Sequence, residues 1–283
     1  EGTEFFVSVD EESTQLVIYE GQVSASNDQG SLMMVGNEAA IVRINEAPQK
    51  VGVISPTDAV QWALYYPTII DYRLDEKLSA ELAWPELQAS LELYRQGHLF
   101  DAIAKLDEVP QSAHTAHFLN YYAGLLLSVG RVEAAQAAIE QALELDSDNS
   151  DAYALTAIIA VVQNDKEQAL ALATQAVELD QTSPTAKLVL SYAQQAHFEI
   201  EEALASVQEA VKNDTQNALA WARLAELQMS TGQLDYALES ARQAVNLNPT
   251  LAKTQTVLGF AHLLQIDTKA AKAIFAKAIK LDQ

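Results

Sequence analysis

The chain has 283 residues and a formal net charge of -22, from 17 lysine and arginine residues against 39 aspartate and glutamate residues. Because this balance repels phosphates and anionic lipid surfaces, nucleic acid is excluded as an expected partner. There is no run of 18 apolar residues, so we expect no direct membrane insertion of this segment. The absence of cysteine excludes disulfides and thiolate chemistry, and it is compatible with an oxidising compartment.

Residues 1–54 form short runs in which apolar and polar side chains alternate, a pattern typical of antiparallel strands. Polar and glycine-containing turns separate these runs. We therefore predict a small β-rich module with strands at Phe5–Val9, Gln15–Tyr19, Gln22–Ser26, Leu32–Val35, Ala40–Ile44 and Val51–Ile54.

Three short motifs within this module have a family resemblance. They are Gly2-Thr3-x-Phe5-x-Val7, Leu16-Val17-Ile18-Tyr19-Glu20-Gly21-x-Val23 and Val35-Gly36-Asn37. Together they resemble the closing part of a FecR-like domain, so residues 1–54 are expected to be a partial FecR-like module. The resemblance implies a non-enzymatic domain of the Gram-negative cell envelope, and hence a periplasmic or outer-membrane associated location.

Residues 55–84 are predicted to be a helical linker. Ser55-Pro56-Thr57-Asp58 suits a helix start, because proline fits the first turn and aspartate favours the positive end. Trp62, Tyr65 and Tyr66 are expected to anchor the β module to the helices that follow, with an aromatic ligand patch as the alternative.

From residue 85 onward the dominant feature is a 34-residue period. Alanine recurs at this interval and again seven positions later, at Ala135, Ala169, Ala203, Ala237 and Ala271 and at Ala142, Ala176, Ala210, Ala244 and Ala278. Such a period indicates stacked helix pairs, each unable to bury its apolar face alone. Alanine suits the contact positions because it lets two helices approach closely at no cost in helix propensity.

The clearest copy carries Trp221, Leu224, Ala225, Gln228, Gly232, Ala237, Ala241, Ala244 and Pro249. This spacing resembles the tetratricopeptide repeat. The expected fold is therefore α+β and mainly α, with a right-handed α-solenoid of about five to six helix-turn-helix repeats over residues 85–283. Repeats are predicted to start near residues 85, 116, 150, 184, 218 and 252.

The turn between the two helices of a repeat shows a departure from the pattern. Gly130 and Gly232 occupy this turn in two repeats, whereas Asn164, Phe198 and Ile266 stand at the equivalent positions in the others. Because phenylalanine and isoleucine disfavour the left-handed conformation, we predict that the turns near Phe198 and Ile266 differ locally.

The resemblance implies that first helices line a concave face where extended peptides or partner helices lie. The positions carried over form a largely apolar strip, and such a strip often marks an interaction site. The alternative is that a neighbouring element, or the superhelix itself, covers much of the strip. The predicted partner-binding residues are Tyr121, Leu155, Ile158, Val162, Val189, Tyr192, Arg223, Glu226, Val257 and Phe260, with Gly124, Ser128, Ala196, Ser230 and Leu264 completing the set.

Family members that clamp a terminal carboxylate place Lys, Asn and Arg on the first helices. Here Asn120, Lys187, Arg223 and Lys253 offer something similar, but the clamp pattern is not reproduced. A peptide-terminus clamp is therefore not expected.

No motif for catalysis occurs in the chain. It lacks a phosphate-binding glycine loop, a nucleophile elbow and an HExxH motif. His114 and His117 could share a helix face, but no third ligand stands at a family spacing. We therefore expect no catalytic residue, cofactor or metal, and an unrecognised hydrolase is kept only as a remote alternative.

The sequence thus predicts a non-catalytic scaffold of the bacterial cell envelope that binds a protein or a peptide. The alternative is the periplasmic stalk of a polysaccharide or adhesin export machine. The sequence ends at Leu281-Asp282-Gln283, at the boundary between one repeat and the next, without an additional polar helix. We therefore expect either that further repeats follow or that this uncapped repeat forms a homo-oligomer.

Overall fold

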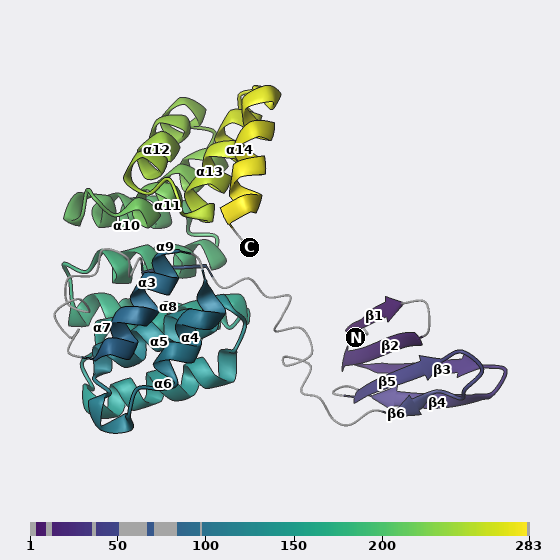
Figure 1. Cartoon of the computed structure of the whole chain (residues 1–283). Helices are drawn as coiled ribbons and strands as arrows, with labels where there is room; N and C mark the ends of the chain where they lie inside the picture. Colours follow the sequence, from purple (N-terminus) through teal and green to yellow (C-terminus); the bar gives the residue numbers. More distant parts are fainter. Residues whose placement is uncertain are drawn as a thin grey trace. The chain divides into compact units, whose positions relative to one another are not determined.

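The computed structural model describes residues 4–9, 13–35, 38–50, 67–70, 84–96 and 98–281 (Figure 1). The chain divides into two compact units, Glu1–Leu64 and Tyr65–Gln283, which are taken separately below. The predicted linker over residues 55–84 lies almost entirely outside the described residues, and so do Trp62, Tyr65 and Tyr66.

The first unit consists of antiparallel strands. One sheet has the order β1-β2-β5-β6, and β3 and β4 form a separate two-stranded sheet. The first five predicted strands are confirmed, and the sixth, Val51–Ile54, lies outside the described residues. The strands are β1 (Glu4–Val9), β2 (Ser13–Glu20), β3 (Gln22–Asn27), β4 (Gly30–Val35), β5 (Glu38–Arg43) and β6 (Gln49–Lys50).

A small apolar core lies within this unit. Ile18 of β2, Ala25 of β3, Met34 of β4 and Ala40 of β5 are buried together. They come from both sheets, and every second residue of a strand faces the same side, so the alternation in the sequence supplies this core. The module is thus held by few residues, as expected for so short a segment.

The second unit consists of α-helices in antiparallel pairs, stacked one after another in Figure 1. Within the described residues there are six such pairs, so the predicted fold class is confirmed. The first helices are α3 (Pro85–Arg95), α5 (Ala116–Ser128), α7 (Ser150–Val162), α9 (Pro184–Ala196), α11 (Ala218–Ser230) and α13 (Ala252–Leu264). The second helices are α4 (Leu99–Leu106), α6 (Val132–Leu145), α8 (Lys166–Leu179), α10 (Ile200–Asn213), α12 (Leu234–Leu247) and α14 (Thr268–Leu281).

Most first helices begin at a side-chain cap. Thr115, Asn149, Ser183 and Asn217 each accept a hydrogen bond from the backbone N–H three residues later, ahead of α5, α7, α9 and α11. Each cap satisfies one of the backbone donors that a helix start leaves without a partner. Capping residues at a 34-residue interval therefore keep the repeats in register.

The alanines that mark the period lie at the centre of each pair. All ten, including Ala135 and Ala169, are buried. They occupy the second helices from α6 to α14, where the first helix of the same repeat packs and, on all of them except α14, the first helix of the next repeat packs as well. Their small side chains are what allow this close packing.

The five turns within these repeats share one backbone conformation. Gly130, Asn164, Phe198, Gly232 and Ile266 all have a positive φ, between 60° and 76°. In every turn the N–H of the following residue also bonds a carbonyl five residues back, as in a Schellman motif. The prediction that the turns near Phe198 and Ile266 differ is wrong, because capping bonds and helix packing outweigh the strain of a left-handed side chain.

This strain gives a matched pair of expected stability changes. The Ile266→Gly variant should be more stable by about 1 kcal/mol, because the Ile266 side chain is 84% exposed and loses little packing. The Gly232→Ala variant should be less stable by about 1 kcal/mol, although an added Cβ would meet no atom within 4 Å. Urea unfolding followed by circular dichroism measures both changes, and two shifts of the same sign would contradict the strain argument.

Candidate binding face of the first helices

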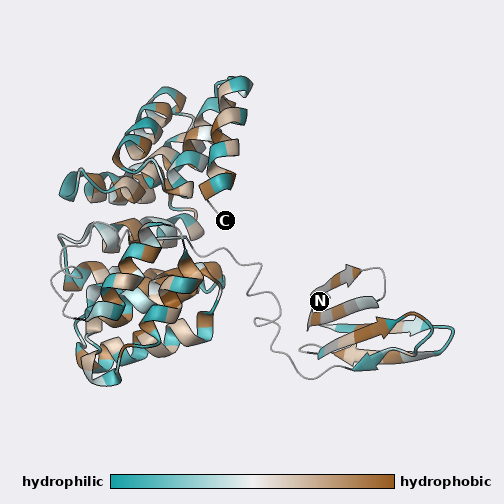
Figure 2. Cartoon of the chain, in the orientation of Figure 1, coloured by the Kyte–Doolittle hydropathy of each residue, from teal (hydrophilic) through white to brown (hydrophobic). Residues whose placement is uncertain are grey.

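The first helices of successive repeats pack directly on one another. This holds for every step from α5 to α13, through α7, α9 and α11. The first helices therefore form one layer, and the second helices flank it. Figure 2 shows hydrophobic and hydrophilic residues interleaved along the helices of this unit, so only part of each helix surface is apolar.

The structure buries many of the predicted binding residues. The expectation of an exposed apolar strip is wrong at these positions, because neighbouring first helices pack closely on one another. Val162, Tyr192 and Glu226 are half-buried, and their role in binding stays a prediction. The fully buried apolar residues are Tyr121, Leu155, Ile158, Val189 and Val257.

Arg223 of α11 joins two repeats in the middle of this layer. Its Nε donates to Ser191 Oγ at 3.1 Å, and its Nη2 donates to Ser191 O at 3.0 Å and Gln195 Oε1 at 2.7 Å. The guanidinium carbon lies 3.8 Å from the ring centroid of Tyr192. Because only 3% of Arg223 is exposed, these contacts to α9 take place away from water and are correspondingly strong.

Glu226 extends the connection to the next repeat. Its carboxylate lies 3.4 Å from Arg223 Nη1 and accepts a hydrogen bond from Lys253 Nζ of α13. Burial, together with the Glu226 carboxylate, raises the pKa of Tyr192, so this phenol stays neutral. We call Ser191, Tyr192, Gln195, Arg223, Glu226 and Lys253 the polar bracket; it connects α9, α11 and α13.

The cationic and amide side chains that could have formed a carboxylate clamp are occupied within the protein. Asn120 donates to Asn149 Oδ1 at 2.8 Å, and Lys187 pairs with Glu209. Arg223 and Lys253 belong to the polar bracket.

The largest exposed apolar side chains on a described first helix are on α13. Phe260, Leu263 and Leu264 are 48%, 42% and 48% exposed. We call these three residues the α13 apolar face. Phe260 and Leu264 were among the predicted positions, whereas Leu263 was missed because the position pattern taken from the family did not include it.

Phe260 rests on a second aromatic ring. Its ring centroid lies 5.1 Å from that of Phe275 on α14, in an edge-to-face arrangement. The Phe275 ring occupies the space beside Gly259, where an added Cβ would lie 2.5 Å from a ring carbon. Gly259 therefore makes room for Phe275, which in turn supports Phe260 at the surface.

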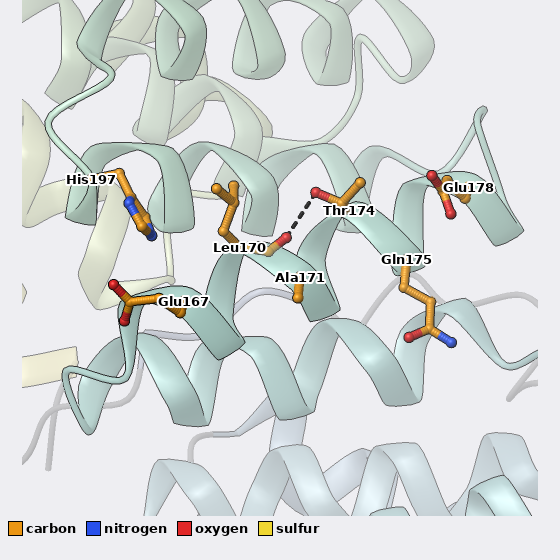
Figure 3. Close-up of a pocket in the computed structure, with 7 residues that line it drawn as sticks. All are labelled: Glu167, Leu170, Ala171, Thr174, Gln175, Glu178 and His197. Carbon is orange, nitrogen blue, oxygen red and sulfur yellow. Dashed lines mark hydrogen bonds between the residues drawn. The ribbon is translucent and has the colours of Figure 1, made fainter.

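A shallow hollow of about 650 Å³ lies on the opposite layer, along α8. Figure 3 shows Glu167, Leu170, Ala171, Thr174, Gln175 and Glu178 on one side of this helix, with His197 nearby. His197 Nε2 lies 2.8 Å from the Lys166 carbonyl and Thr174 Oγ1 donates to the Leu170 carbonyl at 2.7 Å. These polar groups are thus partly satisfied by the protein.

Neither a metal-binding cluster nor a membrane-spanning helix is found in the part of the chain that the structure describes. No three His, Cys, Asp or Glu side chains there are placed to hold an ion. None of the helices there has the length and apolar character that crossing a bilayer requires.

A family model, the tetratricopeptide repeat, matches residues 123–184 and 188–252. The matched helix pairs are thus similar to tetratricopeptide repeats. The matched stretches extend from α5 to the start of α13, and so include Arg223, Glu226 and the rest of the polar bracket except Lys253. Proteins with tetratricopeptide repeats act as scaffolds that bind other proteins or peptides.

One solved structure of a tetratricopeptide-repeat protein resembles the chain in fold, and two further solved structures match it with lower TM-scores. A thermophilic repeat protein of Thermus thermophilus is 21% identical, with a TM-score of 0.54 over 63% of this chain and 97% of that one. MamA of Desulfovibrio magneticus RS-1 is 20% identical, with a TM-score of 0.42 over 59% and 94%. YrrB, described as having an unusual peptide-binding site, is 23% identical, with a TM-score of 0.39 over 65% and 91%. No curated protein matches the sequence significantly.

Proposed function

We propose that this protein is a non-catalytic scaffold that binds an apolar segment of another protein or peptide through the α13 apolar face. The observation that carries the proposal is the exposure of Phe260, Leu263 and Leu264 on α13, the first helix of the last described helix pair. Removing their apolar surface from water is favourable by about 25 cal/mol per Å². The face therefore supplies the apolar centre that a binding site needs.

The neighbouring polar bracket supplies the charged edge of the proposed site. The side chains of Glu226 and Lys253 keep 23% and 18% of their surface exposed. They stand on α11 and on the first turn of α13, the helix that carries the apolar face. A polar rim around an apolar centre sets the orientation of a partner more than its affinity.

Peptides selected from a random library displayed on phage test this proposal. Peptides that bind the wild-type chain should bind the Phe260→Glu/Leu264→Glu variant at least about tenfold more weakly, since a carboxylate in a desolvated contact is costly. The Ile279→Glu variant is the matched control, because Ile279 is an exposed aliphatic residue on the second helix of the same repeat. Equal binding by the wild type and the double variant, or an equal loss in the control, would refute the assignment.

We further propose a location in the bacterial cell envelope, in the periplasm or at the outer membrane. Support comes from the resemblance of the motifs between Gly2 and Asn37 to a FecR-like domain, and the cysteine-free composition is compatible with it. Fractionation of cells that express the complete gene tests this location, and recovery with the cytoplasmic fraction would oppose it.

The second proposal is that the repeats form the stalk of a polysaccharide or adhesin export machine within the envelope. Co-purification with such a machine would distinguish this role from that of a free scaffold.

A further inference from the structure

The second helices α6, α8, α10, α12 and α14 present equivalent outer faces. The six residues of α8 in Figure 3, from Glu167 to Glu178, define this face, and the 34-residue period places equivalent residues on the other second helices. On α6 the outer face is Glu133, Gln136, Ala137, Glu140, Gln141 and Glu144, and on α14 it is Lys269, Lys272, Ala273, Ala276, Lys277 and Lys280. All twelve residues are exposed.

The charge of the outer face reverses along the stack of repeats. The α6 face has three glutamates and no cation, whereas the α14 face has four lysines and no anion. Lys269 stands where Glu133 stands, and Lys280 stands where Glu144 stands, four repeats apart. The faces of α8, α10 and α12 are net acidic, so α14 alone among these five helices is basic in a chain of net charge -22.

These charges are not neutralised within the described residues. The ion pairs found there, such as Lys187 with Glu209 and Lys253 with Glu226, involve none of the α14 lysines and none of the α6 glutamates. Because these four lysines are exposed, a partner that approaches α14 meets four hydrated ammonium groups on one helix face.

The shape of the two faces suits contact between helices. Ala137 lies at the centre of the α6 face, and Ala273 and Ala276 lie at the centre of the α14 face. Small residues between long charged ones let two helix backbones approach while the charged groups meet at the ends. In an antiparallel arrangement, Lys269 would lie near Glu144 and Lys280 near Glu133.

We propose that the α14 outer face of one copy docks on the α6 outer face of a second copy of this chain. The partner is argued from charge complementarity, because a second copy presents an acidic face in the same helical register as the basic one. Two different faces meet, so the association is heterologous and adds copies in a row unless the arrangement closes. It uses the second helices and leaves the α13 apolar face of the proposed function on the other layer.

The two copies also repel each other through their net charges. This repulsion acts over long distances and is screened at about 0.15 M salt, where the Debye length is about 8 Å. Direct pairs between lysine and glutamate persist at that ionic strength and weaken at about 1 M. Association is therefore expected to be weak, strongest near physiological ionic strength, and lost at high salt.

Sedimentation velocity of the full chain over a concentration series tests the proposal. At about 0.15 M salt the average mass of the wild type should rise with concentration, and at about 1 M it should stay that of a monomer. The variants Lys269→Glu/Lys272→Glu/Lys277→Glu/Lys280→Glu and Glu133→Lys/Glu140→Lys/Glu144→Lys should each remain monomeric. An equimolar mixture of the two should associate, because each variant then meets a face of opposite charge.

A control variant distinguishes an effect of the net charge of the chain from an effect of the charges on the α6 and α14 outer faces. The variant Glu46→Lys/Glu92→Lys/Glu108→Lys has the same change in net charge as the α6 variant, at exposed residues that belong to neither face, and should associate like the wild type. A wild type that is monomeric at every concentration, or a mixture that fails to associate, overturns the proposal. Binding of wild type, but not of the lysine variant, to phosphatidylserine vesicles without self-association would overturn it in favour of an anionic surface.

Discussion

The Ile158→Glu variant is expected to lose at least about 4 kcal/mol of stability and to unfold part of the repeat array. Ile158 is fully buried between first helices, so the change removes a packed aliphatic side chain and places a carboxylate where no water reaches it. Loss of this size approaches the whole stability of many domains. Urea unfolding followed by circular dichroism measures it.

The Phe260→Glu variant is the matched control for Ile158→Glu. Phe260 stands at the same position of the repeat, three repeats later, but it is 48% exposed. Its replacement should cost only about 1 kcal/mol, mainly from the contact with the Phe275 ring. If Ile158→Glu and Phe260→Glu lost the same amount of stability, Ile158 could not be buried between the first helices as the structure has it.

The Arg223→Ala variant is expected to lose about 3 kcal/mol, because it removes the hydrogen bonds and the ring contact of a buried guanidinium and leaves a cavity in its place. Ser191 and Gln195 would lose their hydrogen bonds from Arg223, and the Tyr192 ring would lose the cation stacked on it. The step between α9 and α11 depends on this side chain, so we expect α11 to α14 to unfold at a lower urea concentration than the preceding helices. The fluorescence of Trp221 of α11, measured with Trp62 and Trp84 replaced by phenylalanine, reports that transition.

The Arg223→Lys variant separates charge from geometry. Lysine keeps the positive charge beside Glu226 but lacks the planar fork that reaches Ser191 and Gln195 together, so most of the loss should remain. The Glu226→Gln variant is the milder comparison, since Glu226 is partly exposed and its pairs are worth little. If the Arg223→Lys variant were as stable as the wild type, the positive charge alone would stabilise the packing of α11 on α9.

Much of the fold was visible in the sequence. The 34-residue alanine period predicted the repeats, and the alternating apolar residues predicted the first five strands. Both patterns are local consequences of helix and strand periodicity, so they can be read without a structure. The functional face was less predictable, because the family pattern names positions on a helix but not which of them a neighbour covers.

Particular residues show where sequence reasoning failed. Phe198 and Ile266 take up the left-handed turn that glycine occupies in other repeats, because the packing of two helices fixes the turn whatever residue it holds. Gln195 and Ser191 gave no sign of their role, since their contacts are made to Arg223 from another repeat. Arg223 and Gln195 are 28 positions apart in the sequence, so only the tertiary structure shows that they are in contact.

The sequence alone determined the register of this protein, that is, which residues of different repeats are equivalent. Register depends on helix period and chain length between caps, which are local properties. The tertiary structure alone decided exposure: Ile158 and Phe260 are equivalent in the repeat, yet one is buried and the other is half exposed. The reason is physical, since burial depends on what the neighbouring helices cover and not on the residue itself.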